Sequence, residues 1–268
     1  DPEMSRGLGD VYKRQSLFYD GILTYPTPDR WCNVIKKHNV SIFGIAPTSI
    51  RLFMRDNNKY TYIDSYDFRK LRILTTTGEP IDRDAWIWHF TKVGKGRCPL
   101  INLSGGTEIG GAILSITFLE FMKPCSVGCP VPGFDASVFD DLGNETTNGF
   151  LVIKKPWPSM TRGLVNGSDK FIENYWSRYK NIWFHGDMIE IDSDGYWYIT
   201  GRIDDIIKVS GHRLGSNEIE NILMSNEFVS EAIVVGIPDE IRGESIVCYI
   251  VPKAVSYTHL RAHETSQD

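Results

Sequence analysis

Helix-like and strand-like segments alternate between residues 27 and 103, and this alternation constrains the fold more than any other feature of the chain. The strand-like segments are short apolar runs, whereas the helix-like segments start at threonine–proline, proline or aspartate positions and carry apolar residues on one face. Strands are predicted at residues 41–46, 71–74 and 99–103, and helices from residues 27, 47 and 82. The alternation indicates a parallel sheet covered by helices, with ligands bound beyond the carboxyl ends of the strands.

The second half of the chain has a different pattern. Between residues 123 and 203, short β runs are separated by turns rich in glycine and aspartate, which is typical of an antiparallel sheet or a small barrel. Residues 205–254 are predicted to form a separate α+β unit with a helix near residues 217–225. We therefore predict an α/β protein. Its large N-terminal domain has a parallel α/β sheet plus an antiparallel β subdomain, and the start of a small α+β C-terminal domain follows.

Charged residues and glycines are concentrated between the short β runs of residues 186–220. Asp187 carries a carboxylate, which can accept hydrogen bonds from both hydroxyls of a ribose. Arg202 and Arg213 carry guanidinium groups, which can each pair with phosphate oxygens through two hydrogen bonds. The segment therefore indicates a nucleotide site. The alternative is a β-meander whose turns are charged.

Two glycine-containing loops follow predicted strands. Thr-Gly-Glu-Pro at residues 77–80 combines a glycine turn, a carboxylate and a helix-starting proline. Taken alone, that loop is best interpreted as a routine strand-to-helix turn. In Ser-Gly-Gly-Thr-Glu at residues 104–108 the glycines let the backbone approach a ligand, Thr107 offers a hydroxyl to phosphate, and Glu108 offers an oxygen ligand to Mg²⁺. A flexible surface turn is the alternative for this second loop.

Together the motifs resemble the adenylate-forming superfamily, the AMP-dependent acyl-CoA synthetases, and in particular the branch that is similar to acetyl-CoA synthetase. Four motifs occur in the expected order: Ala-Pro-Thr at residues 46–48, Gly-Glu-Pro at 78–80, Ser-Gly-Gly-Thr-Glu at 104–108, and residues 186–220. The resemblance implies that a small-molecule carboxylate is activated to an acyl-adenylate and then transferred to coenzyme A. ATP or AMP, Mg²⁺ and coenzyme A are the implied cofactors.

The resemblance also implies roles for single residues. Thr107 and Glu108 would contact phosphate and Mg²⁺, and Asp187 would bind the ribose. Arg202 and Arg213 would hold ribose or phosphate oxygens, and Asp204 would be the hinge of the small domain. Residues that would surround adenine and the acyl group are Thr77, Gly78, Glu79, Pro80, Asn102, Leu103, Ser104, Gly105 and Gly106, and those that would line the coenzyme A channel are Ala46, Ser210 and Gly211.

One departure from the family pattern concerns the acyl pocket. Members specific for acetate typically carry a tryptophan and a glutamine at the positions of Gly105 and Gly106. Because the indole is missing here, we expect room for small or medium-chain acids longer than acetate, with a broad preference. Acetate specificity is the alternative.

Both ends of the chain lack periodicity and do not continue their neighbouring elements. We interpret residues 1–15 and 255–268 as adaptor-derived segments. Residues 16–204 would then be the C-terminal part of the large AMP-binding domain, and residues 205–254 the start of the small mobile domain. By resemblance, a phosphate loop would precede residue 16 and a catalytic lysine would follow residue 254. We therefore expect an internal fragment that is inactive by itself.

Composition narrows the partners. The net charge of −5 does not indicate nucleic acid or an anionic membrane surface, and no apolar run approaches the ~18 residues of a membrane helix. Five cysteines, an odd number, favour a reducing compartment, and we predict the cytoplasm. Cys125 and Cys129 are predicted to be thiols rather than zinc ligands, and Arg162 to be solvated. Rival functions are an amino-acid-activating or luciferase-like enzyme, a nucleotide-binding protein without turnover, and a structural α/β domain.

Overall fold

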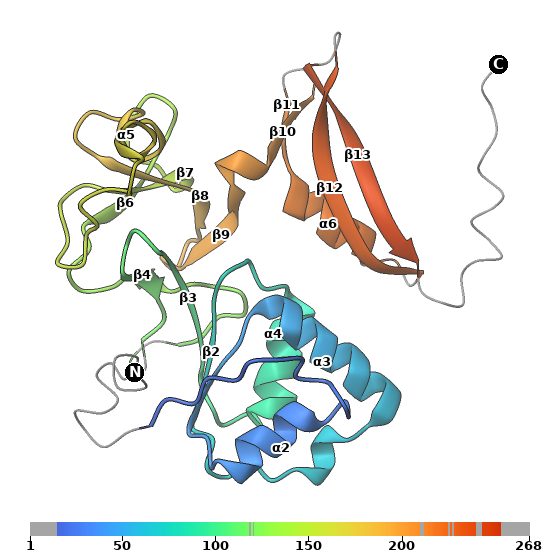
Figure 1. The fold of residues 1–268 in the computed structure, drawn as a ribbon. Coiled ribbons are helices and arrows are strands. Elements are labelled where there is room, and N and C mark those ends of the chain that lie inside the picture. The colour runs from blue at the N-terminus through green and yellow to red at the C-terminus, as the bar shows by residue number, and fades with distance from the viewer. Residues whose placement is uncertain are drawn as a thin grey trace, which may run out of the picture.

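The structure, a computed structural model, describes residues 15–117, 119, 121–209, 212–224, 226, 228–239 and 243–252. Within these residues the chain forms three sheets, which follow one another from the blue to the red end of the ribbon in Figure 1. The predicted fold class is confirmed, because a parallel α/β sheet, an antiparallel β region and a small α+β unit occur in that order.

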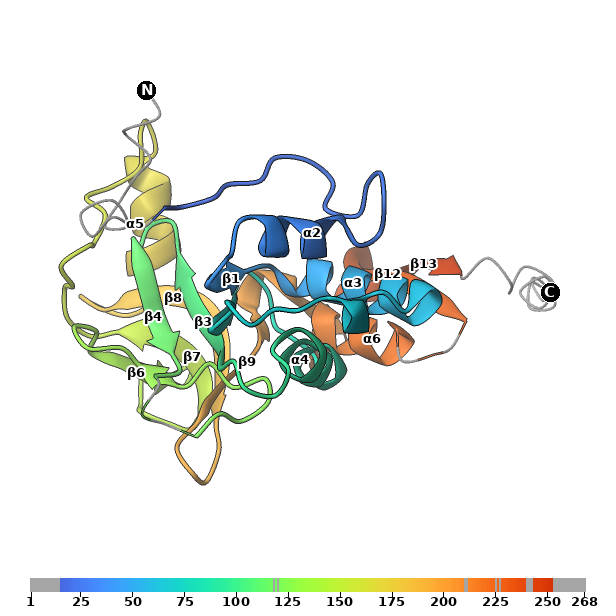
Figure 2. The same cartoon turned by 90° about the horizontal axis from the view of Figure 1, so that it is seen from below.

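The first sheet has the strand order β1–β2–β3–β4–β5. β1, β2 and β3 are parallel, whereas β4 and β5 extend the sheet in antiparallel orientation. Helices α2, α3 and α4 gather around the parallel strands (Figure 2). The strands are β1 (Ile42–Gly44), β2 (Ile73–Thr76), β3 (Leu100–Gly106), β4 (Gly111–Ser115) and β5 (Cys129–Pro130).

Helices α3 and α4 begin where the sequence favours helix initiation, whereas α2, predicted from residue 27, begins at Arg30. Pro47 takes the first position of α3, where its missing N–H leaves no bond unmade. Asp82 caps α4, because its carboxylate accepts a hydrogen bond of 2.8 Å from the backbone N–H of Ala85. The helix predicted from residue 82 has two parts, α4 and the π-helix η2. The helical elements are α2 (Arg30–Lys37), α3 (Pro47–Tyr60), η1 (Ile63–Ser65), α4 (Arg83–Trp88) and η2 (His89–Val93).

A hydrophobic core lies between these helices and the parallel strands. Trp31 of α2 is fully buried and stacks on Phe53 of α3, with ring centroids 4.3 Å apart. Ile50 of α3 and Leu74 of β2 are also fully buried, and Ile35 of α2 is nearly so. The predicted inward faces of α2 and α3 are therefore confirmed at these positions.

The second sheet is antiparallel, with the order β6–β7–β8–β9. Its core centres on Trp183 of β8, which is fully buried and stacks on Tyr175 at 4.2 Å between ring centroids. Tyr175 belongs to α5, a helix that the sequence interpretation missed; Phe171 and Tyr175, four residues apart, both contact Trp183. The elements are β6 (Ala136–Phe139), β7 (Asn148–Ile153), α5 (Ser168–Trp176), β8 (Trp183–Ile191) and β9 (Trp197–Arg202).

The third sheet has the order β11–β10–β13–β12 and is antiparallel. Helix α6 lies between β11 and β12 in the sequence and contacts both, and Glu220 of α6 accepts a hydrogen bond of 2.8 Å from the backbone N–H of Val234. The α+β unit predicted after residue 205 therefore has its helix and its strands. The elements are η3 (Ile203–Asp205), β10 (Ile206–Val209), β11 (His212–Gly215), α6 (Ser216–Met224), β12 (Val229–Asp239) and β13 (Gly243–Pro252).

Two predicted strand boundaries need correction. The strand predicted at residues 71–74 lies at Ile73–Thr76, because the backbone N–H of Leu71 instead closes a turn with the carbonyl oxygen of Phe68. β3 continues through Gly106, because Gly105 and Gly106 pair with β4, so that residues 104–106 belong to a strand and not to a loop.

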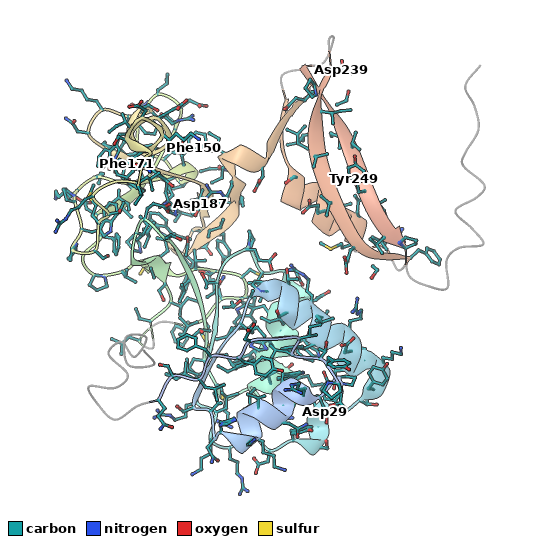
Figure 3. The ribbon with its side chains drawn as sticks, viewed as in Figure 1. Asp29, Phe150, Phe171, Asp187, Asp239 and Tyr249 are labelled. Atoms are coloured by element: carbon teal, nitrogen blue, oxygen red, sulfur yellow. The ribbon has the colours of Figure 1, made fainter. Side chains whose placement is uncertain are left out.

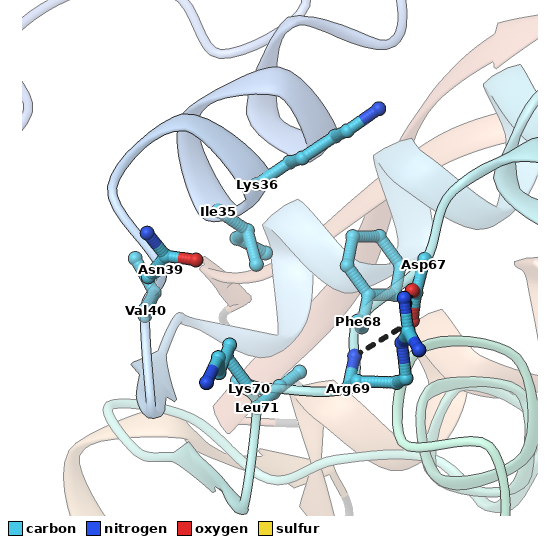
Figure 4. Close-up of a pocket in the computed structure, with 9 residues that line it drawn as sticks. All are labelled: Ile35, Lys36, Asn39, Val40, Asp67, Phe68, Arg69, Lys70 and Leu71. Carbon is cyan, nitrogen blue, oxygen red and sulfur yellow. Dashed lines mark hydrogen bonds and ion pairs between the residues drawn. The ribbon is translucent and has the colours of Figure 1, made fainter.

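A cavity of about 610 Å³ lies at the amino-terminal side of β1 and β2, opposite the carboxyl ends of the parallel strands (Figure 4). It is formed by the end of α2 and the loop at residues 67–71, and it contains none of the predicted site residues.

Every helix in the described part of the chain is too short or too polar to cross a membrane.

Candidate functional site

A second cavity lies at the carboxyl ends of β2 and β3, where the first sheet meets the second. Its volume is about 280 Å³. The loop after β2 forms one side, the end of β3 another, and residues of β8 and β9 complete it; Figure 3 labels Asp187 of β8. Of the predicted site residues, those that line this cavity are Thr77, Gly78, Glu79, Pro80, Asn102, Leu103, Ser104, Gly105, Asp187 and Arg202.

Asp187 is the buried charge of this cavity. Its side chain is 9% exposed and makes contacts from two directions. Ser104 of β3 donates a hydrogen bond from its hydroxyl to Oδ2 at 3.3 Å, and Arg202 of β9 forms an ion pair with Oδ1 at 3.0 Å. The ion pair follows from the register, because Asp187 and Arg202 are direct partners in the β8–β9 ladder. A carboxylate has about four lone-pair positions, so these contacts leave it able to accept from a ligand hydroxyl.

The loop at residues 77–80 is held by a clamp from α3. Gly78 has a φ of +103°, a conformation that glycine adopts without strain. The carboxylate of Glu79 accepts hydrogen bonds from the backbone N–H of Thr48 at 2.6 Å and from the Thr48 hydroxyl. Arg51 bridges Glu79 Oε2 at 3.0 Å and Asp82 Oδ2 at 3.2 Å. Glu79 therefore fixes the loop against α3 rather than presenting both its oxygens to the cavity.

The β3–β4 hairpin corrects one sequence-based expectation. A Cβ on Gly105 would lie 2.0 Å from the carbonyl oxygen of Gly111 and 3.1 Å from Cα of Ala112. The side-chain direction at position 105 is thus occupied by the backbone of β4. The expectation that the missing indole leaves empty space along that direction is wrong, because glycine is required there for close backbone packing.

Several predicted residues are not part of the lining of this cavity. Gly106 ends β3, and Thr107 and Glu108 form the turn that follows it, with Glu108 half-buried. Ala46 immediately precedes α3. Arg213 and Asp204 are placed by their backbones in β11 and η3, and their side chains are outside the described atoms. Ser210 and Gly211 lie outside the described residues.

The structure also describes the cysteines and Arg162, for which the sequence predicted thiols and a solvated side chain. Cys125 lines the cavity, and burial raises its pKa to about 11. No group of three or more His, Cys, Asp or Glu side chains suited to a metal occurs in the part of the chain that the structure describes. The five cysteines, all within that part, form no disulfide. Arg162 is exposed, as predicted.

Sequence reasoning missed several residues of the site. Tyr198, Ile199 and Gly201 of β9 line the cavity, and so does Asp205 of η3. His185 is buried beside Asp187, with Nε2 3.7 Å from Asp187 Oδ2. The sequence could have indicated His185, because residues two apart in a strand share a face and Asp187, two residues later, was already a candidate site residue.

Two models of protein families match this chain. The AMP-binding enzyme family matches residues 14–165. The chain belongs to the AMP-binding enzyme family. The C-terminal domain of AMP-binding enzymes matches residues 218–267 as well.

Relatives of this AMP-binding enzyme include acetyl-coenzyme A synthetases. That of Rubrobacter xylanophilus is 42% identical over 240 residues, which are 88% of this chain and 37% of the relative. That of Pyrobaculum aerophilum is 40% identical over 243 residues, which are 88% of this chain and 36% of the relative. The predicted resemblance is thereby confirmed. The chain spans a little over a third of the length of these relatives.

A solved structure shares the fold. The crystal structure of the anthranilate CoA ligase AuaEII in complex with anthranoyl-AMP superposes with a TM-score of 0.72 at 22% identity. The match covers 92% of this chain and 46% of that one. At this level of identity the likeness concerns the fold, which supports the arrangement of sheets described above.

Proposed function

We propose that this chain is part of an AMP-forming acid–CoA ligase that acts on a small or medium-chain carboxylic acid. In this reaction the carboxylate attacks the α-phosphate of ATP, which releases pyrophosphate and gives an acyl-adenylate. The coenzyme A thiol then displaces AMP. The observation that carries the proposal is the meeting of Asp187, Ser104 and the loop at residues 77–80 around one cavity at the carboxyl ends of the parallel strands.

The proposal gives each side of the cavity a task. The Asp187 carboxylate accepts hydrogen bonds from the ribose hydroxyls, and the ion pair with Arg202 orients that carboxylate. The loop at residues 77–80, fixed by Thr48 and Arg51, forms a rigid wall for the adenine. Positioning of this kind matters because phosphoryl-type chemistry depends on alignment and charge neutralisation. The backbone of residues 102–106 completes the wall beside the acyl group.

The residues present fit a Mg²⁺ ion that is held mainly by substrate phosphates. Such an ion needs only one or two protein carboxylates, because phosphate oxygens and water supply its other ligands. Glu108 offers one carboxylate in the β3–β4 turn, and its Oε2 lies near Gly106, 3.7 Å from where a Cβ on that glycine would be. When bound, Mg²⁺ neutralises charge on the phosphates. Thr107, exposed in the same turn, would donate its hydroxyl to a phosphate oxygen.

Coenzyme A binding and domain movement also belong to the proposal. Ala46, Ser210 and Gly211 are proposed to line the coenzyme A channel, and Arg213 to approach the phosphates. We place the hinge at Asp204, between residues 16–204 and residues 205–254, because η3 joins β9 of the second sheet to β10 of the third. We also propose a reducing compartment such as the cytoplasm, because the cysteine count of five is odd.

The acid itself has two candidates. The relatives named acetyl-coenzyme A synthetase, at about 40% identity, favour acetate. A broader range of short acids is the other candidate, and it does not rest on Gly105, because the backbone of β4 occupies the side-chain direction at that position. The cavity of about 280 Å³ is at the small end of ligand pockets, which supports a short acid in either case.

The test uses the longest native protein that contains this chain. Pyrophosphate exchange is measured with acetate, propionate, butyrate, hexanoate and octanoate, followed by coenzyme A-dependent release of AMP. We expect exchange with at least one of these acids, and AMP rather than ADP as product. Asp187→Asn should lower exchange at least 100-fold, whereas Glu173→Gln, which changes an exposed carboxylate on α5, should leave it unchanged. Exchange that is absent with all five acids would overturn the proposal.

A further inference from the structure

His185 lies on β8, two residues before Asp187, with only the glycine Gly186 between them. Gly186 has a φ of +89°, and a Cβ there would lie 3.3 Å from Nη2 of Arg202. The β7–β8 ladder changes register in this stretch, because residues 185–187 of β8 lie opposite the single residue 151 of β7 and form a bulge. The bulge brings His185 and Asp187 against the end of β3, His185 beside Gly105 and Gly106 and Asp187 beside Ser104.

The imidazole lies beside Asp187 on one side. Trp183 donates a hydrogen bond from Nε1 to Nδ1 of His185 at 3.4 Å, which makes Nδ1 an acceptor and assigns the proton to Nε2. Burial lowers the pKa of His185 and favours this neutral form, although the nearby Asp187 carboxylate acts in the opposite direction. Nε2 then faces Asp187 Oδ2 at 3.7 Å, and the ring also hydrogen-bonds with the backbone of Gly105.

The same imidazole lies beside Gly106 on the other side. A Cβ on Gly106 would lie 3.2 Å from Cε1 of His185 and 3.7 Å from its Nε2. The ring therefore occupies the space into which a side chain at position 106 would project. The Glu108 carboxylate borders the same space, with Oε2 3.7 Å from that Cβ position. Glycine at position 106 and histidine at position 185 are thus complementary in shape.

We infer that His185 is a positioning residue that sets the distance between the Asp187 carboxylate and the turn of Gly106 and Glu108. This inference rests on the proposed function, in which the first element binds the ribose and the second the phosphates and Mg²⁺. A ring wedged between them fixes both ends of the nucleotide relative to each other. The side chain contacts neither the reacting atoms nor the metal in this role, and it acts through its neighbours.

The experiment measures AMP affinity and the kcat and KM for ATP in the longest native protein that contains this chain. The variants are His185→Ala, His185→Gln and Gly106→Ala, together with the double variant of His185→Ala and Gly106→Ala. His38→Ala is the matched control, because His38 is exposed and lies outside the site. Tryptophan fluorescence and circular dichroism of each variant establish that it is folded.

We expect His185→Ala to weaken AMP binding and raise the KM for ATP about tenfold, the lower end of the loss that follows when a partner that orients a metal ligand is removed. His185→Gln keeps an N–H donor and should recover most of this loss. Gly106→Ala should be impaired alone because it meets the ring. The double variant should lose less than the product of the two single losses, because the added methyl then fills the space that the ring has left.

The outcomes separate the two hypotheses. If the wild-type protein binds AMP and all His185 variants match His38→Ala, the inference is overturned while the proposed function stands. Losses in the double variant that simply multiply would also overturn it, because the two positions would then be independent. A wild-type protein that neither binds AMP nor exchanges pyrophosphate would overturn the proposed function and this inference with it.

Discussion

Replacement of Gly105 by alanine tests the packing of the hairpin that forms one wall of the site. The Cβ of Gly105→Ala would meet the carbonyl oxygen of Gly111 at 2.0 Å. Real Cβ contacts essentially never fall below 3.0 Å, so the backbones of β3 and β4 must move apart by about 1 Å at this position. No flexible side chain is there to yield instead, because the obstructing atom belongs to the backbone. Overpacking of a well-packed interior costs ~1–3 kcal/mol, and a clash with backbone belongs at the upper end of that range. We therefore expect a loss of about 3 kcal/mol, or roughly 150-fold in the unfolding equilibrium.

The matched control is Gly111→Ala in the same hairpin. Its Cβ would have no neighbour closer than Ser159 Oγ at 4.0 Å. We expect a change within about 1 kcal/mol, because the alanine meets no obstacle and reduces the freedom of the unfolded chain.

Urea denaturation followed by tryptophan fluorescence measures both variants. All seven tryptophans lie at or before residue 197, so the signal reports on the first two sheets and not on the third. Trp157 also donates a hydrogen bond from Nε1 to the carbonyl oxygen of Ile109 in the hairpin turn, at 2.9 Å. Equal urea midpoints for Gly105→Ala and Gly111→Ala would refute the close approach of β3 and β4.

Three further predictions concern other parts of the chain. The Lys123 hydrogen bond holds the pKa of Asp192 at about 2, below its unfolded value of about 3.9, so its stabilising effect is present above about pH 4 and is lost as the pH falls toward 2. Lys123→Met should remove that part of the acid dependence of the urea midpoint. Trp183→Ala should lower the unfolding free energy by ~3–5 kcal/mol in the same assay, because the buried indole leaves a cavity beside Tyr175. Iodoacetamide at pH 8 should label exposed Cys248 and spare Cys32, whose pKa is raised by burial, as mass spectrometry of the native protein would show.

Much of the fold could be predicted because local chemistry and periodicity agreed with it. β1 lies within the predicted residues 41–46, α3 begins at Pro47, and α6 begins within one residue of its predicted start. α5 was missed because it is only nine residues long, which leaves little room for a helical pattern, and because its aromatic residues are also common in strands. Its Phe171 and Tyr175 are organised by Trp183, which comes from another element and cannot be recognised from local sequence.

The candidate site was predicted as a set of residue types, and the structure altered how two of them are understood. Glu79 carries the expected carboxylate, but its contacts with Thr48 and Arg51 make it a clamp between the loop and α3. Gly105 stands at the expected position, but its neighbour is the Gly111 carbonyl and not an open pocket. Both results depend on pairs more than five residues apart, whose contacts arise only when the sheet forms.

The sequence by itself determined the order of the elements and the chemical groups available for nucleotide binding. Helix starts, strand periodicity and the ordered glycine and carboxylate motifs are local properties, so they can be read along the chain. Only the tertiary structure decided that Ser104, Arg202 and His185 converge on Asp187. The reason is that the β8–β9 register and the β8 bulge set the position of Asp187, whereas its hydrogen bond with Ser104 joins residues 83 apart in the sequence.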